Sequence, residues 1–164
     1  MRYFKISDFD TANGLGIGNV LWVSGCSHHC PQCHNPQTWD KNAGEEFTEE
    51  VLDNLLEKLK RPYIKRLTLS GGDPLFLGNR DEITNVVRKV KKKFPNIKIW
   101  CYTGYLWEDV KDLPCMDFID VLVDGEFKAE LKDITLPFCG SSNQRIINVK
   151  ESLKKGCVVL EEIC

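Results

Sequence analysis

The chain has 164 residues, enough for one domain with a core of its own. It carries 22 basic and 24 acidic side chains, a net charge of −2, and this balance gives no reason to expect binding to a nucleic acid or to a membrane surface. The first residues lack the apolar run of a signal peptide, and no stretch approaches the roughly 20 apolar residues of a membrane span. We therefore expect a single cytoplasmic domain over residues 1–164.

Strand-like and helix-like segments alternate along most of the chain. The first strong helix signal is Thr48, a favourable N-cap that is followed by Glu49 and Glu50 and then by a stripe of leucines. Pro62 follows the end of this helix. Further helices are predicted over residues 80–94 and 107–111. Strands are predicted over residues 3–6, 20–24, 64–70, 97–101, 118–123, 144–149 and 157–163.

This alternation predicts an α/β fold with a mostly parallel sheet and right-handed connections. A complete eight-stranded barrel needs roughly 200 residues or more, so an open, partial (β/α) barrel fits the length better. Ligands of such sheets bind at the carboxyl ends of the strands. A cysteine-rich segment, Gly71-Gly72-Asp73 and Tyr102-Thr103-Gly104 each follow a predicted strand. We expect these three segments to meet at one rim.

Three of the eight cysteines form a tight group with the spacing C-x3-C-x2-C, at Cys26, Cys30 and Cys33. Disulfides are rare in the cytoplasm. Three thiolates on one loop can each bind one iron of a [4Fe-4S] cluster, whereas four cysteine ligands are the commoner arrangement. Because a fourth cysteine ligand is missing, one iron is left open to a substrate. In zinc proteins, such an open coordination position distinguishes catalytic sites from structural ones. The group is therefore predicted to hold a catalytic cluster.

A structural zinc site is the alternative for the same loop, because His28, His29 and His34 are the only histidines and all lie beside the cysteines. Zinc sites usually combine two ligand pairs separated by a longer insert, and no second pair occurs here, so the cluster is favoured. The other five cysteines are scattered. Cys101 is predicted to be a small buried residue. Cys157 and Cys164 could bind a second metal, but nothing in their spacing requires such a site.

The cysteine spacing after a strand resembles the signature of the radical S-adenosylmethionine (SAM) superfamily. The segment Gly71-Gly72-Asp73-Pro74 resembles that superfamily's glycine-rich SAM motif. Over about residues 8–150 the chain is similar to the family of activases of anaerobic ribonucleoside-triphosphate reductase, through segments 13–17, 22–26, 33–39, 100–105, 120–125 and 140–145. Gln32 stands where many members carry an aromatic residue, and Asn19 and Cys139 stand where the family often has arginine.

The resemblance implies two cofactors, a [4Fe-4S] cluster on the three cysteines and SAM. It implies reductive cleavage of SAM and formation of a glycyl radical on the partner, the large subunit of the anaerobic reductase, with a small electron donor such as flavodoxin. The residues expected to contact SAM are Gln32, Cys33, His34, Gly71, Gly72, Asp73, Thr103 and Asp124. Asp73 has an alternative role as an Asx-turn residue before Pro74, and Thr103 and Asp124 have alternative roles in turns.

Two other functional classes remain open at this point. The chain could be another radical SAM enzyme, either a formate-lyase-type activase or a small-molecule synthase. It could instead be a zinc or electron-transfer module without enzymatic activity. So short a chain has little material with which to enclose a small substrate, and this favours a protein substrate that docks on an open rim.

Overall fold

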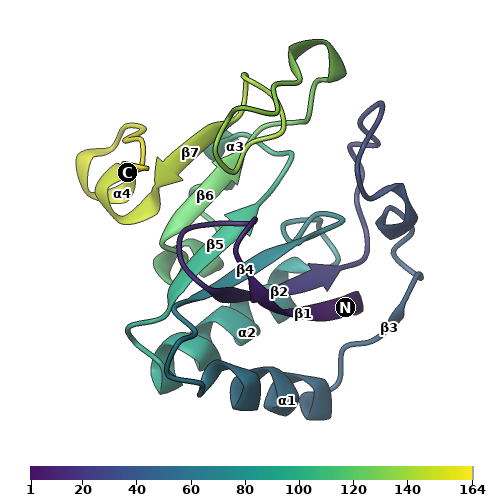
Figure 1. Ribbon diagram of the computed structural model, residues 1–164, viewed down its shortest axis with the longest axis vertical. Helices are drawn as coiled ribbons and strands as arrows, with labels where there is room; N and C mark the ends of the chain where they lie inside the picture. The colour runs from purple at the N-terminus through teal and green to yellow at the C-terminus, as the bar shows by residue number, and fades with distance from the viewer. Residues whose placement is uncertain (164) are drawn as a thin grey trace.

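The computed structural model describes residues 1–163, which form a seven-stranded sheet with the strand order β3-β1-β2-β4-β5-β6-β7 (Figure 1). The strands are β1 (Arg2–Asp10), β2 (Gly18–Val23), β3 (Glu45–Glu46), β4 (Arg66–Gly71), β5 (Lys98–Tyr102), β6 (Val121–Asp124) and β7 (Arg145–Asn148). The α-helices are α1 (Glu49–Leu59), α2 (Arg80–Lys93), α3 (Trp107–Val110) and α4 (Val149–Lys155), and short 3-10 helices span Pro36–Thr38, Pro114–Asp117 and Ala129–Leu131. No helix within residues 1–163 has the length and apolar character needed to cross a membrane.

The four central strands, β2, β4, β5 and β6, are parallel to one another. Antiparallel strands flank them, with β1 beside β2 and β7 beside β6. The sheet stays open because β3 and β7 are its two edges. The prediction of an α/β fold with an open, mostly parallel sheet is confirmed, and the carboxyl ends of the parallel strands lie along one edge.

Helices α1 and α2 cover one face of the sheet. The Thr48 hydroxyl accepts a hydrogen bond from the Val51 amide at 3.4 Å, so α1 begins where the N-cap predicted. The apolar stripes of both helices pack on alternate residues of the central strands, which form one buried core: Leu52, Leu55, Leu56 and Leu59 from α1, Ile83, Val86, Val87 and Val90 from α2, and Leu21, Val23, Leu67, Leu69 and Ile99 from the strands. Cys101 lies in this core, fully buried as predicted.

The opposite face carries a buried arginine at the amino ends of the strands. The Arg66 guanidinium donates to the carbonyl oxygens of Asp10 (2.7 Å) and Asn13 (2.8 Å) and to the Asp10 carboxylate (2.9 Å). A Cβ at Gly14, whose φ is +137°, would lie 2.6 Å from Cδ of Arg66. The loop after β1 is thus fixed against this face of the sheet, where its residues Ala12 and Asn13 line a cavity that extends to the carboxyl ends of the strands.

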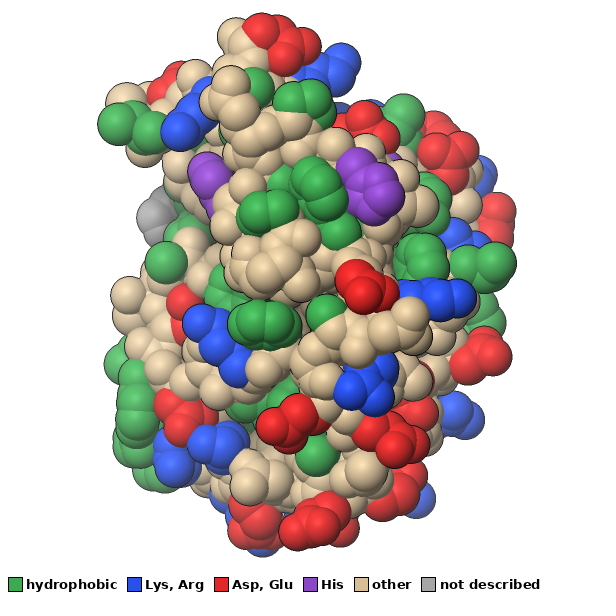
Figure 2. Space-filling view, turned by 90° about the vertical axis from the view of Figure 1, so that its right-hand side faces the viewer, with side chains coloured by type: hydrophobic (Ala, Val, Ile, Leu, Met, Phe, Trp, Pro, Cys, Tyr) green, Lys and Arg blue, Asp and Glu red, His purple; other side chains and the backbone are tan. Residues whose placement is uncertain are grey.

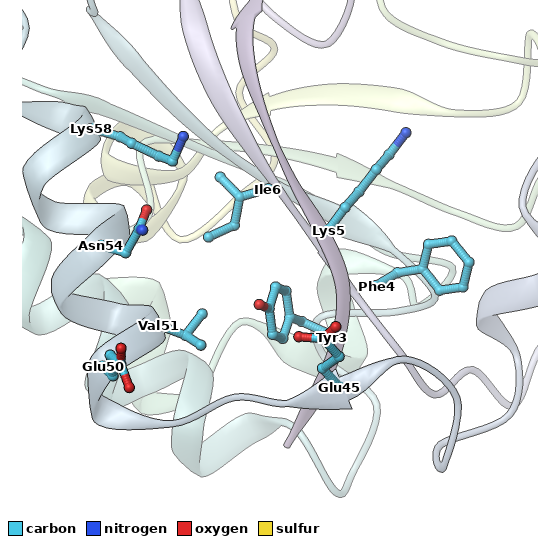
Figure 3. Close-up of a pocket in the computed structure, with 9 residues that line it drawn as sticks. All are labelled: Tyr3, Phe4, Lys5, Ile6, Glu45, Glu50, Val51, Asn54 and Lys58. Atoms are coloured by element: carbon cyan, nitrogen blue, oxygen red, sulfur yellow. The ribbon is translucent and has the colours of Figure 1, made fainter.

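A groove of about 320 Å³ separates β1 from α1. Figure 3 shows Tyr3 and Ile6 pointing from β1 toward Val51 of α1, while Phe4 and Lys5 point away from the helix. This groove shares no lining residue with the cavity at the carboxyl ends of the strands.

The C-terminal predictions need correction. The chain turns into α4 directly after β7, where the Asn148 side chain accepts from the Glu151 amide at 3.0 Å and Gly156, with φ of 70°, ends the helix. The strand predicted over residues 157–163 was wrong, because only Leu160 forms an isolated bridge, to Ile147. The strand predicted from residue 118 begins at Val121, after a 3-10 helix. Cys164 lies outside the described residues.

The buried carboxylate of Asp120 is expected to make the fold sensitive to acid. It accepts hydrogen bonds from Lys91 and from the Ile99 amide, and Lys150 lies 3.0 Å away. Burial alone would raise the pKa of Asp120, but these donors lower it. A carboxylate whose pKa is lower in the folded state stabilises the fold at pH values above its pKa in the unfolded state, about 3.9. This stabilisation is lost as the pH falls through the folded-state pKa.

We therefore expect Asp120→Asn to lower the free energy of unfolding at pH 7, and the difference from wild type to shrink as the pH falls below about 4. Urea denaturation of both proteins between pH 7 and pH 3 measures this. A difference that stays constant over that range would contradict the assignment.

Candidate functional site

The cysteine segment follows β2 and is held at the carboxyl edge of the sheet by backbone hydrogen bonds. The Gly25 amide donates to the Thr38 carbonyl at 2.8 Å, and the Cys26 amide donates to the Trp39 carbonyl at 3.1 Å. His29 and Gln32 adopt left-handed backbone conformations, with φ of 48° and 58°. These conformations are uncommon outside glycine and mark tight turns within the loop.

The three cysteines line a single cavity of about 480 Å³ on the face of the sheet opposite the helices. Gly71, Gly72, Asp73, Thr103 and Gly104 line the same cavity, so the structure brings together the three segments that the sequence places after separate strands. The remaining wall comes largely from the segment between β6 and β7, through Gly125, Phe127, Leu136, Phe138, Cys139, Gly140 and Gln144. Figure 1 shows this segment and the cysteine loop rising at the same end of the molecule.

Two glycines let the end of β4 lie directly against the end of β2. Gly71 has φ of +113°, and a Cβ there would lie 2.5 Å from the Val23 carbonyl oxygen. A Cβ at Gly72 would lie 2.5 Å from the Gly25 carbonyl oxygen. Because backbone atoms cannot move aside as a flexible side chain can, both positions require glycine, and the cysteine loop starts in contact with the glycine-rich segment.

Asp73 connects the ends of β4 and β5 and is almost fully buried. Its carboxylate accepts from the Thr103 hydroxyl at 2.9 Å, from the Gly104 amide at 2.9 Å and from the Leu75 amide at 2.8 Å. The bond from Leu75 is the Asx-turn that the sequence left open. The bonds from Thr103 and Gly104 give the same carboxylate a second role, because they join two neighbouring strand ends.

His28 reaches across the cavity rim from the cysteine loop. Its Nδ1 lies 2.8 Å from Oε1 of Glu126, and its Nε2 lies 3.1 Å from Oδ2 of Asp73. The imidazole also meets the Tyr105 ring edge-on, with ring centroids 4.6 Å apart. Asp73 and then Glu126 raise the pKa of His28 against the opposing effect of burial.

The other predicted site residues are divided between the cavity and its surroundings. His34 lines the cavity, with its ring 5.4 Å from that of Phe127. Gln32 is exposed and does not line the cavity. Asp124 is fully buried behind the wall, where it accepts from the Trp107 amide at 2.8 Å and from Arg145 Nε at 3.0 Å.

Several cavity residues were not singled out from the sequence. Trp22 and Ser70 line the cavity from the ends of β2 and β4. Strand alternation could have predicted their position. In a strand, the neighbours of residues that face the helices point to the other side of the sheet. Phe127 and Phe138 belong to an irregular segment whose path over the cavity has no comparable periodicity.

The donor set fits an iron–sulfur cluster. The seven cysteines within residues 1–163 are all free, and burial raises the pKa of the Cys26 and Cys30 thiols, so metal binding must displace their protons. Within the same residues no three His, Cys, Asp or Glu side chains gather around one point as a single metal ion requires. A cubane places each thiolate on a different iron, and Cys26, Cys30 and Cys33 all line the one cavity.

Figure 2 shows the side of the molecule that carries the cysteine loop, with histidine side chains beside a group of hydrophobic side chains. All three histidines of the chain belong to this loop. His29 and His34 are exposed, whereas the His28 side chain is only 11% exposed. The loop therefore turns one imidazole inward and presents the other two at the surface.

Comparisons with known proteins agree with this site. The sequence profile of the 4Fe-4S single cluster domain family matches residues 12–147. The anaerobic ribonucleoside-triphosphate reductase-activating protein of Enterobacteria phage T4 is 43% identical over 146 residues, covering 89% of this chain and 93% of the relative. The chain belongs to this family of activating proteins.

Activating proteins of the same description from two bacteria match the chain at similar identity. That of Escherichia coli K12 is 39% identical over 154 residues, covering 92% of this chain and 100% of the relative. That of Vibrio cholerae is 40% identical over 150 residues, covering 89% of this chain and 97% of the relative. The match to the 4Fe-4S single cluster domain family, over residues 12–147, includes the cysteine loop, the glycine-rich segment and the wall between β6 and β7.

Proposed function

We propose that this protein is a radical SAM enzyme that generates a glycyl radical on an anaerobic ribonucleoside-triphosphate reductase. The observation that carries the proposal is the meeting of Cys26, Cys30 and Cys33 with Gly71 and Gly72 on one cavity at the carboxyl edge of the sheet. Membership of the activating-protein family supports the choice of reaction and partner.

The three cysteines are proposed to hold the [4Fe-4S] cluster, which leaves one iron without a protein ligand. A cluster held by these cysteines would supply one electron, received from a reductant, for the cleavage of SAM to methionine and a 5′-deoxyadenosyl radical, which would take a hydrogen atom from a glycine Cα of the partner to give 5′-deoxyadenosine. The chain itself supplies position, since the cavity of about 480 Å³ lies within the roughly 300–1,000 Å³ that small-molecule sites occupy.

The glycine-rich segment is proposed to bind the methionyl end of SAM. Without side chains at Gly71 and Gly72, backbone groups can approach a ligand closely. Asp73 then acts as the support that fixes this segment, because its carboxylate is occupied by the Leu75, Thr103 and Gly104 donors. Thr103 and His34 line the cavity and are proposed to contact SAM. Gln32 and Asp124 do not line the cavity, and we propose that neither contacts SAM directly.

The proposed partner is the large subunit of the reductase, with a small electron donor such as flavodoxin. The free cysteines are consistent with a reducing compartment, and we propose that the protein acts in the cytoplasm. We propose that a partner loop that carries the glycine enters this cavity, which the cysteine loop and the segment between β6 and β7 both line.

The deciding experiment mixes the reconstituted protein with SAM, a reductant and the reductase under anaerobic conditions. We expect an electron-paramagnetic doublet of a glycyl radical on the reductase, together with methionine and 5′-deoxyadenosine. A reductase with alanine at the radical glycine is the matched control and should give no doublet. Cleavage of SAM without a doublet on competent reductase would indicate another radical SAM enzyme, and absence of both would exclude the radical SAM assignment.

A further inference from the structure

The cysteine loop is attached to the strand ends through His28. The loop begins at Gly25, whose carbonyl accepts from the Asp73 amide at 2.7 Å. Two residues after Cys26, the His28 side chain returns to the same aspartate, with Nε2 at 3.1 Å from the carboxylate. Asp73 is therefore joined to the loop twice, once through its backbone and once through its side chain.

The second contact of His28 extends this attachment to β6. Its Nδ1 lies 2.8 Å from Glu126, which comes two residues after the end of β6. The imidazole is only 11% exposed, whereas the Glu126 side chain is 52% exposed. One largely buried ring thus lies between carboxylates that follow two different strands, with a hydrogen bond to Glu126 and a close polar contact of 3.1 Å to Asp73. Hydrogen bonds to charged partners are stronger than those between neutral groups.

Gly104 shows that the chain makes room for this ring. A Cβ at position 104 would lie 2.5 Å from Cδ2 and 2.8 Å from Nε2 of His28. The φ of Gly104 is outside the positive range that disfavours other residues, so its backbone conformation does not require glycine. The requirement for glycine here comes from the imidazole.

We propose that His28 is a positioning residue that fixes the segment from Cys26 to Cys30 against Asp73, and so sets the place of the cluster relative to the glycine-rich SAM segment. The inference rests on the proposed function in one respect, the assignment of Cys26 and Cys30 as cluster ligands. The contacts of His28 hold the loop and the end of β4 together as a single unit. This matters because the rate of a reaction between two bound groups depends steeply on their relative position.

The first test uses the protein without its cluster and measures alkylation of individual thiols by mass spectrometry. We expect His28→Ala to raise the alkylation rates of Cys26 and Cys30 by about tenfold or more, since local opening becomes easier when the hydrogen bond to Glu126 and the close contact with Asp73 are lost. The rates of Cys101 and Cys115, which are fully buried in the core, should not change.

Matched variants distinguish the loss of the His28 contacts from effects that any substitution in the cysteine loop would have. His29→Asn removes an exposed imidazole from the adjacent position, keeps a residue type that tolerates the left-handed φ of 48°, and loses only the contact with the Trp39 ring, so it should change the rates by less than about twofold. His28→Gln keeps one hydrogen-bonding arm and should restore part of the protection. Gly104→Ala should reproduce the effect of His28→Ala, because its methyl group occupies the place of the ring.

The second test uses the reconstituted protein. We expect His28→Ala to keep the wild-type iron content, because the three thiols remain, and to cleave SAM roughly tenfold more slowly or worse. His29→Asn should match wild type in both measurements. Unchanged alkylation in His28→Ala would overturn the proposal, as would an equal rise at Cys101 and Cys115. A wild-type protein that binds no cluster would refute the proposed function, and the alkylation rates would still decide whether His28 fixes the loop.

Discussion

Replacing Cys30 with alanine is expected to abolish cluster binding and all cleavage of SAM. Cys30 lies between Cys26 and Cys33 in the loop and lines the cavity with both. A cubane held by three thiolates already lacks one protein ligand, so a further loss leaves two irons without protein coordination. We expect the Cys30→Ala protein to remain folded, since Cys30 belongs to a surface loop rather than to the core.

The measurements are iron and sulfide content, the visible absorbance of the reconstituted protein and the yield of 5′-deoxyadenosine. Cys157→Ala is the matched control, because Cys157 is exposed and does not line the cavity. It should retain wild-type iron content and cleavage. Retained SAM cleavage by Cys30→Ala would refute the assignment of this ligand, and retained zinc with no iron in the wild-type protein would refute the cluster itself.

Gly71→Ala is expected to have the largest effect on stability of any glycine substitution proposed for this protein. The new Cβ would lie 2.5 Å from the carbonyl oxygen and 2.6 Å from the amide nitrogen of Val23, in the neighbouring strand. The φ of +113° is also one that L-residues rarely adopt. Separation of β2 from β4 would be needed to relieve the overlap, and we expect a loss of about 3 kcal/mol or more in the free energy of unfolding.

Gly156→Ala is the control that separates the steric overlap of the new Cβ from the strain of a positive φ. Gly156 also has a positive φ, +70°, but a Cβ there would meet nothing within 4 Å. Its substitution should cost about 1–2 kcal/mol, the ordinary penalty for a left-handed residue. Urea denaturation of both variants at pH 7 gives the two values. A loss in Gly71→Ala that does not exceed the loss in Gly156→Ala would contradict the close approach of the two strands.

The sequence determined the elements and the motifs of this protein because both depend on local chemistry. Thr48 and the leucine stripe defined α1, the apolar segments defined the parallel strands, and the spacing of three cysteines in one loop identified the cluster motif. The C-terminal helix α4 was missed, because its short segment lacks a strong apolar stripe and forms only where Asn148 caps it after β7.

Only the tertiary structure decided which side chains meet. His28 and Glu126 are 98 residues apart, and Asp73 and Thr103 are 30 residues apart, so no local pattern connects them. The sequence also could not distinguish Thr103, which lines the cavity, from Asp124, which lies behind its wall with Arg145. Both follow a strand, and the direction of each side chain depends on the strand register and on the partner that satisfies its polar atoms.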